Sequence, residues 1–331
     1  MARIFAYIIH KAGVVDDSAA ELLVAAKKID PAAAPVAIVT GSGPNVDAVC
    51  ESVRTMYPEV WKISNETLAY PNAELVRQAL VNVVPQGSIT LLSHEHFGID
   101  LAPGLAVKTN AAFVSDVLDI VPLDATHLKM VRQEFGGQIS THVRCDISTG
   151  AVITVRPGAF KPLAAAPVNG AVVDKSAEVG TLTAKRRYIE TIVAEAGGVD
   201  ITKQDVLISV GRGIQEADNV KIAEDLAEAV GGAVSCSRPV VDAKWLEKSR
   251  QVGTSGQTVK PKVYMACGIS GAFQHVAGIK GNPLIIAINK NPKAPIFQVA
   301  EVGIVADILE FLPVLTNKFR EARGLAAKGG R

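Results

Sequence analysis

The sequence predicts an α/β protein of two domains, each a mostly parallel sheet flanked by helices. Short runs of β-branched and other apolar residues alternate with longer Ala-, Leu-, Glu- and Lys-rich stretches at helical spacing, which is typical of strands joined by crossover helices. A chain of 331 residues also exceeds what one compact core usually holds. We place the domain boundary at residues 195 and 196, which gives an N-terminal domain of residues 1–195 and a C-terminal domain of residues 196–331.

The first half begins with a strand over residues 3–9. A helix follows over residues 18–29, where the hydroxyl of Ser18 is placed to cap the first turn. The next predicted elements are a strand at 35–41, a helix at 71–84 and a buried strand at 88–94. This alternation of strands and helices favours a parallel sheet.

The strand and helix pattern weakens between residues 153 and 190, which are rich in Pro, Ala and Gly, and we expect irregular strands there before the chain crosses into the second domain. The pattern resumes with a strand at 206–210 and a helix that Gly231 ends. Two further strands are predicted at 262–268 and 283–289.

Composition excludes several classes of function. Lys plus Arg number 34 and Asp plus Glu 33, so the balanced charge gives no reason to bind nucleic acid or an anionic membrane. Apolar runs are too short for stable membrane insertion, and the N-terminus lacks a secretory pattern, so we expect a cytoplasmic protein. The four cysteines are scattered without a CxxC pair, which argues against a disulfide framework or structural zinc.

Glycine-rich turns gather at strand ends in the second half, in "SVGRGI", "VGTSGQ" and "ACGISGAFQH". Glycine lets the backbone approach a phosphate, and the N-terminus of a helix supplies free N–H groups. One such turn is weak evidence, whereas three in one domain favour a dinucleotide. None has the GxGxxG spacing, which argues against an ordinary Rossmann NAD site.

These motifs carry a resemblance to a known family. Residues 261–315, with "CGISGAFQHVAG" and "PLIIAIN", resemble the C-terminal signature of the electron transfer flavoprotein alpha subunit. "GRGI", "SRPVVDAKW" and "QVGTSG" match that family in order, and "FGIDLAPGLAVKTNAAFVSDVLDI" matches more loosely in the first half. The similarity covers essentially the whole chain.

The resemblance implies one FAD in the C-terminal domain, a fold similar to that of deoxyhypusine-synthase-like NAD and FAD sites, and a beta subunit as heterodimer partner. The N-terminal domain would pack on that subunit, which would carry AMP or a second FAD. The residues implied to contact FAD are Arg212, Ser237, Arg238, Val252, Gly253, Thr254, Ser255, Ser270, Gly271, Ala272, Phe273, Gln274, His275, Asn289 and Asp307.

Three of these residues have implied roles at the isoalloxazine ring. Arg238 resembles the arginine beside the ring, Ser255 the hydroxyl that bonds its central-ring nitrogen, and His275 the histidine that faces its pyrimidine carbonyl. A donor or cation there favours reduced, negatively charged flavin. Thr254 replaces the family's usual Gln and Pro239 its usual Ala, which puts the redox potential in doubt.

As a member of this family the chain would carry electrons from a flavin dehydrogenase, such as an acyl-CoA dehydrogenase, to a quinone reductase or another acceptor. One alternative is a subunit of an electron-bifurcating complex that oxidises NADH and reduces ferredoxin plus an enoyl-CoA. Alternatives of other classes are an NAD-dependent enzyme and a cofactor-free scaffold subunit.

Three other features have plain structural readings. His94 and His96 would share one face of a strand, yet two ligands do not make a closed metal site, so we predict none. Cys267 is expected at a buried strand end as a packing residue. "GSGPN" at residues 41–45 is expected to be a turn.

Overall fold

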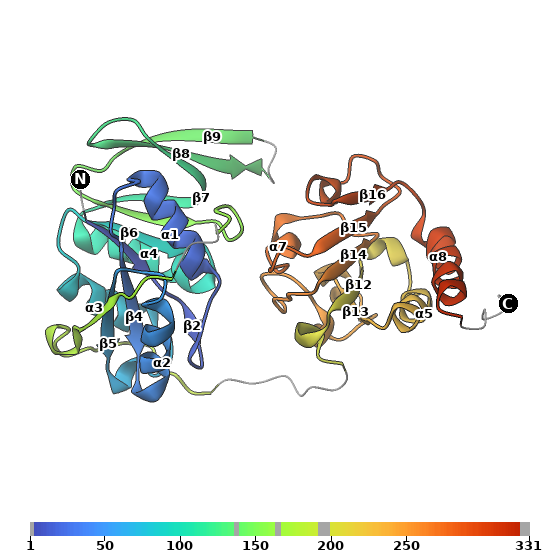
Figure 1. The fold of residues 1–331 in the computed structure, drawn as a ribbon, viewed down its shortest axis with the longest axis horizontal. Coiled ribbons are helices and arrows are strands. Elements are labelled where there is room, and N and C mark those ends of the chain that lie inside the picture. Colours follow the sequence, from blue (N-terminus) through green and yellow to red (C-terminus); the bar gives the residue numbers. More distant parts are fainter. Residues whose placement is uncertain (1–2, 136–138, 163–166, 191–198, 325–331) are drawn as a thin grey trace. The chain divides into compact units, whose positions relative to one another are not determined.

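A computed structural model describes residues 3–135, 139–162, 167–190 and 199–324. The chain divides into two compact units, residues 1–190 and 191–331. Each unit is a sheet with helices packed against it (Figure 1). The predicted α/β class with mostly parallel sheets is therefore confirmed. The predicted boundary at residues 195 and 196 lies outside the described residues.

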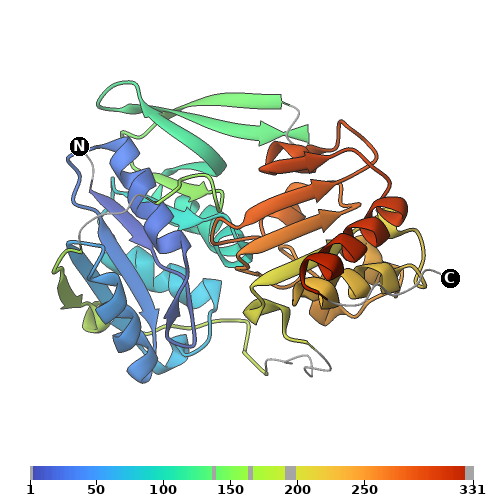
Figure 2. The same cartoon turned by 45° about the vertical axis from the view of Figure 1, so that its right-hand side comes forward.

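The sheet of the first unit has nine strands among the described residues. In spatial order they are β11 (Ala171–Asp174), β5 (Glu59–Ser64), β4 (Val36–Gly41), β1 (Ile4–Tyr7), β6 (Ile89–Ser93), β10 (Ala151–Val155), β7 (Ala112–Pro122), β8 (His127–Glu134) and β9 (Ile139–Asp146). Every pair from β11 to β7 is parallel. β8 and β9 add antiparallel to β7 and form a long ribbon at the edge of the sheet (Figure 2).

Alternate side chains of the central strand β1 pack on opposite faces of this sheet, as strand geometry requires. Ile4 and Ala6 belong to the core under α1 (Ser18–Ile29) and α2 (Gly43–Val53). Phe5 and Tyr7 belong to the core under α3 (Ala73–Val83) and α4 (His96–Thr109). A small hairpin of β2 (His10–Lys11) and β3 (Val14–Val15) follows β1.

The predicted cap of α1 was wrong. Ser18 is the first residue of the helix rather than the residue before it, and its buried hydroxyl has no hydrogen-bond partner among the described residues. The carboxylate of Asp16 accepts the N–H of Ser18 at 2.8 Å instead. An acidic side chain two residues earlier therefore satisfies the free N–H group that the serine was expected to serve.

The predicted placement of two histidines on one strand was also wrong. β6 ends at Ser93, and His96 is already the first residue of α4. His94 bonds Thr154 Oγ1 at 2.9 Å. The chain can turn from strand to helix so quickly because Gly98, which lacks a Cβ, packs directly against the Ser93 carbonyl. No group of three metal-binding side chains occurs in the described part of the chain.

The sheet of the second unit is fully parallel. Its strands are, in spatial order, β13 (Ala233–Cys236), β12 (Val206–Val210), β14 (Val263–Cys267), β15 (Leu284–Ile288) and β16 (Val302–Ile304). The predicted strand at 206–210 is confirmed, as is Gly231, whose left-handed φ of 73° ends α5 (Val220–Val230).

Helices cover the two faces of this sheet unequally. α5 and α8 (Ile308–Ala322) lie side by side on one face (Figure 2), where they cover Val210 and Met265. The other face, which includes Leu207 and Tyr264, is covered by Val252, Val259 and neighbouring loop residues. One face of the sheet is therefore covered mainly by loops, and binding sites in proteins are commonly built on loops.

Within the described residues, no helix is both long and apolar enough to cross a bilayer.

Candidate cofactor site at the carboxyl edge of the second sheet

Each strand of the second sheet is followed by at least one residue that the sequence predicted at the cofactor. Because the strands are parallel, their carboxyl ends lie along one edge, where α/β folds bind ligands. The residues that follow β12, β13, β14, β15 and β16 at this edge are Arg212, Ser237, Ser270, Asn289 and Asp307. The fold thus brings together residues that are nearly 100 positions apart in the sequence.

The strand order places a topological switch point between β12 and β14, since the chain runs from β12 out to β13 and returns to β14 on the other side. Glycines close the two loops at this point. A Cβ on Gly213 would lie 2.7 Å from Gly268 Cα, so only glycine permits this approach of the two backbones. Gly271 adopts a φ of +87° beside Ile296. The glycine turns therefore pack the loops against each other at the switch point.

The loop from Val252 to Gln257 does not directly follow a strand, yet it lies at the same carboxyl edge of the sheet. Its first residue is joined to the end of β13, since Val252 N–H donates to Cys236 O at 2.8 Å. The N–H of Thr254 donates to Gln274 O at 2.8 Å, which ties the loop to α7 (Phe273–Val276). Gly253 has a φ of +136° there. The predicted segments 252–255 and 270–275 therefore lie against each other.

The predicted residues differ in exposure, and Gly271, Asn289 and Asp307 are intermediate. The side chains of Arg212, Arg238, Ser255 and Ser270 are exposed and can reach a ligand. Ser237, Val252, Gly253 and His275 are buried.

Arg238 begins α6 (Arg238–Asp242), with Pro239 in the first turn, where a missing N–H costs nothing. Its side chain is 69% exposed, and Nε lies 3.4 Å from Asp242 Oδ2, one turn along the helix. Such an exposed pair contributes little to stability. The guanidinium is therefore held loosely enough to turn toward a ligand at this edge.

His275 has both ring nitrogens occupied within the protein. Nδ1 lies 3.1 Å from Val252 O and Nε2 lies 2.8 Å from Tyr264 Oη. A carbonyl can only accept, so Nδ1 carries the proton, and the unprotonated Nε2 faces a phenol oxygen whose single proton is shared with Ser209. Ser209 Oγ, 2.7 Å from the same phenol oxygen, extends the chain of bonds into the sheet. His275 therefore anchors the 252–257 loop to two strands.

Burial lowers the pKa of His275 to about 4, and the hydrogen bond to Val252 offsets only part of that effect. The imidazole is thus neutral at physiological pH and supplies no positive charge. Its contact with the flavin stays a prediction, and so does the place of Arg238 beside the ring.

Asn289 and Asp307 are engaged in local structure. Asn289 Nδ2 donates to Ile269 O at 2.9 Å and so holds the loop that carries Ser270. Asp307 caps α8 by accepting the Leu309 N–H at 2.9 Å. Both are only partly buried.

Sequence reasoning missed three buried residues whose hydrogen bonds support the predicted site: Ser209, Gln251 and Tyr264. The two hydroxyl-bearing residues lie in strands that read simply as buried, and Gln251 directly precedes the glycine loop. A polar residue at a core position was the available signal, because buried polar groups need partners.

The Cys267 prediction is confirmed, since this side chain is fully buried at the end of β14 and burial raises its pKa to about 12. Residues 41–45 are not a plain turn, because α2 begins at Gly43.

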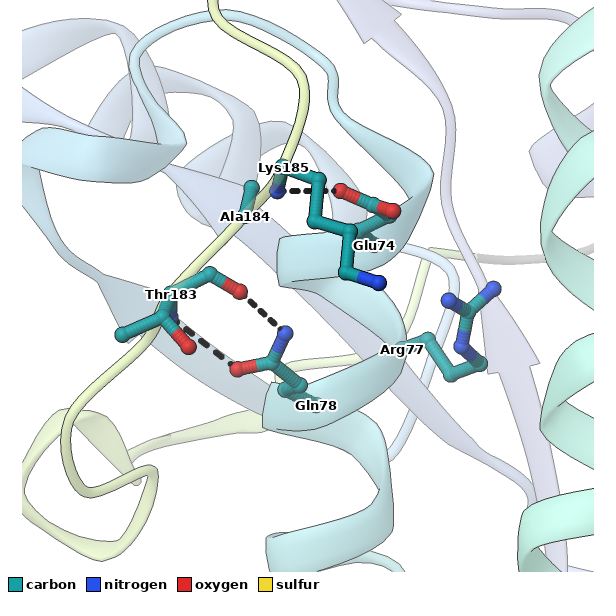
Figure 3. A pocket seen from close by; sticks show the side chains of 6 residues that line it. All are labelled: Glu74, Arg77, Gln78, Thr183, Ala184 and Lys185. Carbon is teal, nitrogen blue, oxygen red and sulfur yellow. Dashed lines mark hydrogen bonds between the residues drawn. The ribbon is translucent and has the colours of Figure 1, made fainter.

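A shallow surface pocket in the first unit lies between α3 and residues 183–185 (Figure 3). Its polar groups bond one another across it. Gln78 donates to Thr183 O and accepts Thr183 N–H, while Glu74 accepts Lys185 N–H at 2.9 Å. The pocket therefore lies where residues 183–185 are hydrogen-bonded to α3.

A parallel sheet with glycine turns at a topological switch point is typical of proteins that bind a nucleotide cofactor. The model of the electron transfer flavoprotein domain matches residues 4–185, and that of the electron transfer flavoprotein FAD-binding domain matches residues 200–280. The chain therefore belongs to the electron transfer flavoprotein family. The second unit contains its FAD-binding domain, and the role of the protein is electron transfer.

Individual relatives agree with this assignment. The electron transfer flavoprotein subunit alpha of Methylophilus methylotrophus is 42% identical over 67% of this chain and 69% of its own length. That of Megasphaera elsdenii is 37% identical over 72% of each chain. Protein FixB of Clostridium saccharobutylicum is 32% identical over 84% of each chain.

Proposed function

We propose that this chain is the alpha subunit of a heterodimer, that it holds one FAD at the carboxyl edge of its second sheet, and that the first unit packs on a beta subunit. The observation that carries this proposal is that each of the five strands described for that sheet is followed by a predicted FAD residue. The names of the relatives, which read "subunit alpha", support a further subunit.

The residues present fit the group. Glycines at the switch point leave the loop backbone without Cβ atoms, so that a pyrophosphate could approach it closely. The exposed hydroxyls of Ser255 and Ser270 can donate to polar edges of the cofactor, and the Arg238 guanidinium can lie beside negative charge. FAD supplies the redox chemistry when bound, while these side chains orient it and set its potential.

Arg238 is the group with which this chain favours the reduced cofactor. A positive charge about 4 Å from a negative one is worth about 4 kcal/mol at an effective dielectric of about 20. Solvent screens an exposed guanidinium and reduces this interaction energy. We therefore expect Arg238 to change the one-electron equilibrium by about tenfold, or about 59 mV.

In this proposal the electrons come from a flavin dehydrogenase, such as an acyl-CoA dehydrogenase, and pass to a quinone reductase or to ferredoxin. The beta subunit would carry AMP or a second FAD. A cytoplasmic location remains a prediction, and so does the choice between a simple carrier and an electron-bifurcating complex.

The test is to co-express this chain with a beta subunit, purify the complex and extract its nucleotides. One FAD plus one AMP per heterodimer supports the simple carrier, and two FAD support bifurcation. Recovery of NAD in place of FAD would contradict the proposal and favour the NAD-dependent alternative.

A further inference from the structure

Gln251 is a buried amide directly beneath the loop that carries Ser255. The residue is only 4% exposed, and Nε2 lies 2.8 Å from Ser255 Oγ. Ser255 itself is exposed at the edge of the site. The pair thus links a fixed interior group to a hydroxyl at the surface where the cofactor is proposed to bind.

The backbone fixes Gln251 in this place. Its N–H donates to Lys248 O at 3.1 Å, and its carbonyl accepts the N–H of Gln257 at 2.6 Å, which closes the loop above it. A Cβ on Gly256 would lie 2.9 Å from Gln251 Cγ, so the loop lies directly on the glutamine stem. The amide has little freedom to leave Ser255.

This geometry determines where the serine proton points. An amide nitrogen can only donate, so Ser255 Oγ accepts in this bond. A serine hydroxyl has one proton, and that proton is then free to point away from the protein interior. We propose that Gln251 is a positioning residue that turns the Ser255 proton outward, so that the hydroxyl meets the cofactor as a donor. The inference rests on the proposed function, in which Ser255 bonds the flavin.

Three variants of the co-expressed heterodimer test it: Gln251→Met, which removes the donor while keeping the length of the side chain, Ser255→Ala, and the double variant. Gln204→Met is the matched control, because Gln204 bonds Asp200 O just before β12, at the opposite edge of the sheet. The readouts are the FAD dissociation constant and the midpoint potential of the bound FAD in equilibrium with a reference dye.

We expect Gln251→Met to shift the one-electron equilibrium of bound FAD by about tenfold, or about 59 mV, in the direction that Ser255→Ala shifts it. In the Ser255→Ala background the same substitution should change nothing further, because there is no hydroxyl left to orient. Gln204→Met should behave as the unaltered protein.

Two results would overturn the inference and leave the proposed function standing. Either Gln251→Met keeps the original potential while Ser255→Ala shifts it, or Gln251→Met shifts the potential equally with and without the Ser255 hydroxyl. If the unaltered heterodimer binds no FAD, the proposed function itself fails.

Gln251→Glu keeps the test decisive if the methionine variant does not fold. A carboxylate can only accept, so it draws the Ser255 proton inward. The added charge acts in both backgrounds, and the part of the shift that disappears in Ser255→Ala measures the orientation of the hydroxyl. If no part disappears, the inference is wrong.

Discussion

The imidazole of His275 and the phenol of Tyr264 are joined by a buried hydrogen bond of 2.8 Å between Nε2 and Oη. Nδ1 of the same ring bonds the Val252 carbonyl, so His275 links strand β14, which carries Tyr264, to the 252–257 loop. The loop is thus set by the interior of the second unit as well as by its own glycines.

Tyr264→Phe should weaken FAD binding and lower the free energy of unfolding by about 1–3 kcal/mol, because it leaves the buried His275 Nε2 and Ser209 Oγ without the hydroxyl that both contact. Urea unfolding and an FAD titration measure the two effects. Tyr7→Phe removes a buried hydroxyl bonded to Thr40 in the first unit and should leave FAD affinity unchanged. Equal FAD affinity in both variants would refute the role of this bond.

The pKa of His275 predicts a pH dependence of stability. Its folded pKa of about 4 lies below the usual value of 6.5, so between these values the unfolded chain binds more protons than the folded one. Stability from this group is complete above about pH 6.5 and falls as the pH drops toward 4, by about 3 kcal/mol in total. Unfolding at pH 7 and pH 5 should show the loss, and His275→Gln should reduce it. An imidazole that titrates near 6.5 by NMR would contradict the prediction.

Arg238→Gln should lower the midpoint potential of bound FAD by about 59 mV, corresponding to a tenfold change, because it removes a positive charge beside the reduced cofactor. Added salt should diminish the difference, since the side chain is exposed. Lys262→Gln removes an equal charge just before β14, at the opposite edge of the sheet, and should have little effect. An unchanged midpoint potential in the Arg238 variant would show that Arg238 does not tune the cofactor.

Gly271→Ala should disrupt the site far more than Gly158→Ala. Both glycines have similar positive φ values, +87° and +85°, so the backbone strain of about 1–2 kcal/mol is shared. An added Cβ meets nothing within 4 Å at Gly158, whereas at Gly271 it meets the backbone of Ile296. Thermal unfolding and FAD affinity measure the difference. If the two variants lose equal stability, the close approach at Gly271 is not essential.

Gln78→Leu should loosen the segment that α3 fastens before the second unit (Figure 3). The substitution removes both hydrogen bonds to Thr183, at a cost of about 1 kcal/mol for a partly exposed pair. Limited proteolysis should then cut near residues 183–186 sooner. Gln133→Leu, on β8, serves as a control, and equal cutting in the two variants would count against the fastening.

Periodicity predicted strands and helices well where the spacing of apolar residues indicated only one kind of element. The strand at 206–210 and the helix at 18–29 appear with the predicted bounds, because alternating burial and helical spacing leave a direct trace in the sequence. Caps were harder. Ser18 and Asp16 are both suitable residues, and only the path of the backbone decides which of them serves the helix end.

The site was predicted by family motifs, which locate residues but not their bonds. The sequence could place His275 near the 252–257 loop, yet its neutral state depends on burial, and its contact with Tyr264 joins positions 11 residues apart; no motif encodes either. Gln251 escaped notice for the same reason, since its importance lies in one hydrogen bond to Ser255.

The most direct test of the account is the visible absorption spectrum of the purified heterodimer of this chain with a beta subunit. The account predicts a flavin band that bleaches on reduction, weakens with Arg212 and Ser270 substitutions in the second unit, and survives the Tyr7→Phe change in the first. A correctly folded complex that remains colourless after incubation with excess FAD would contradict it.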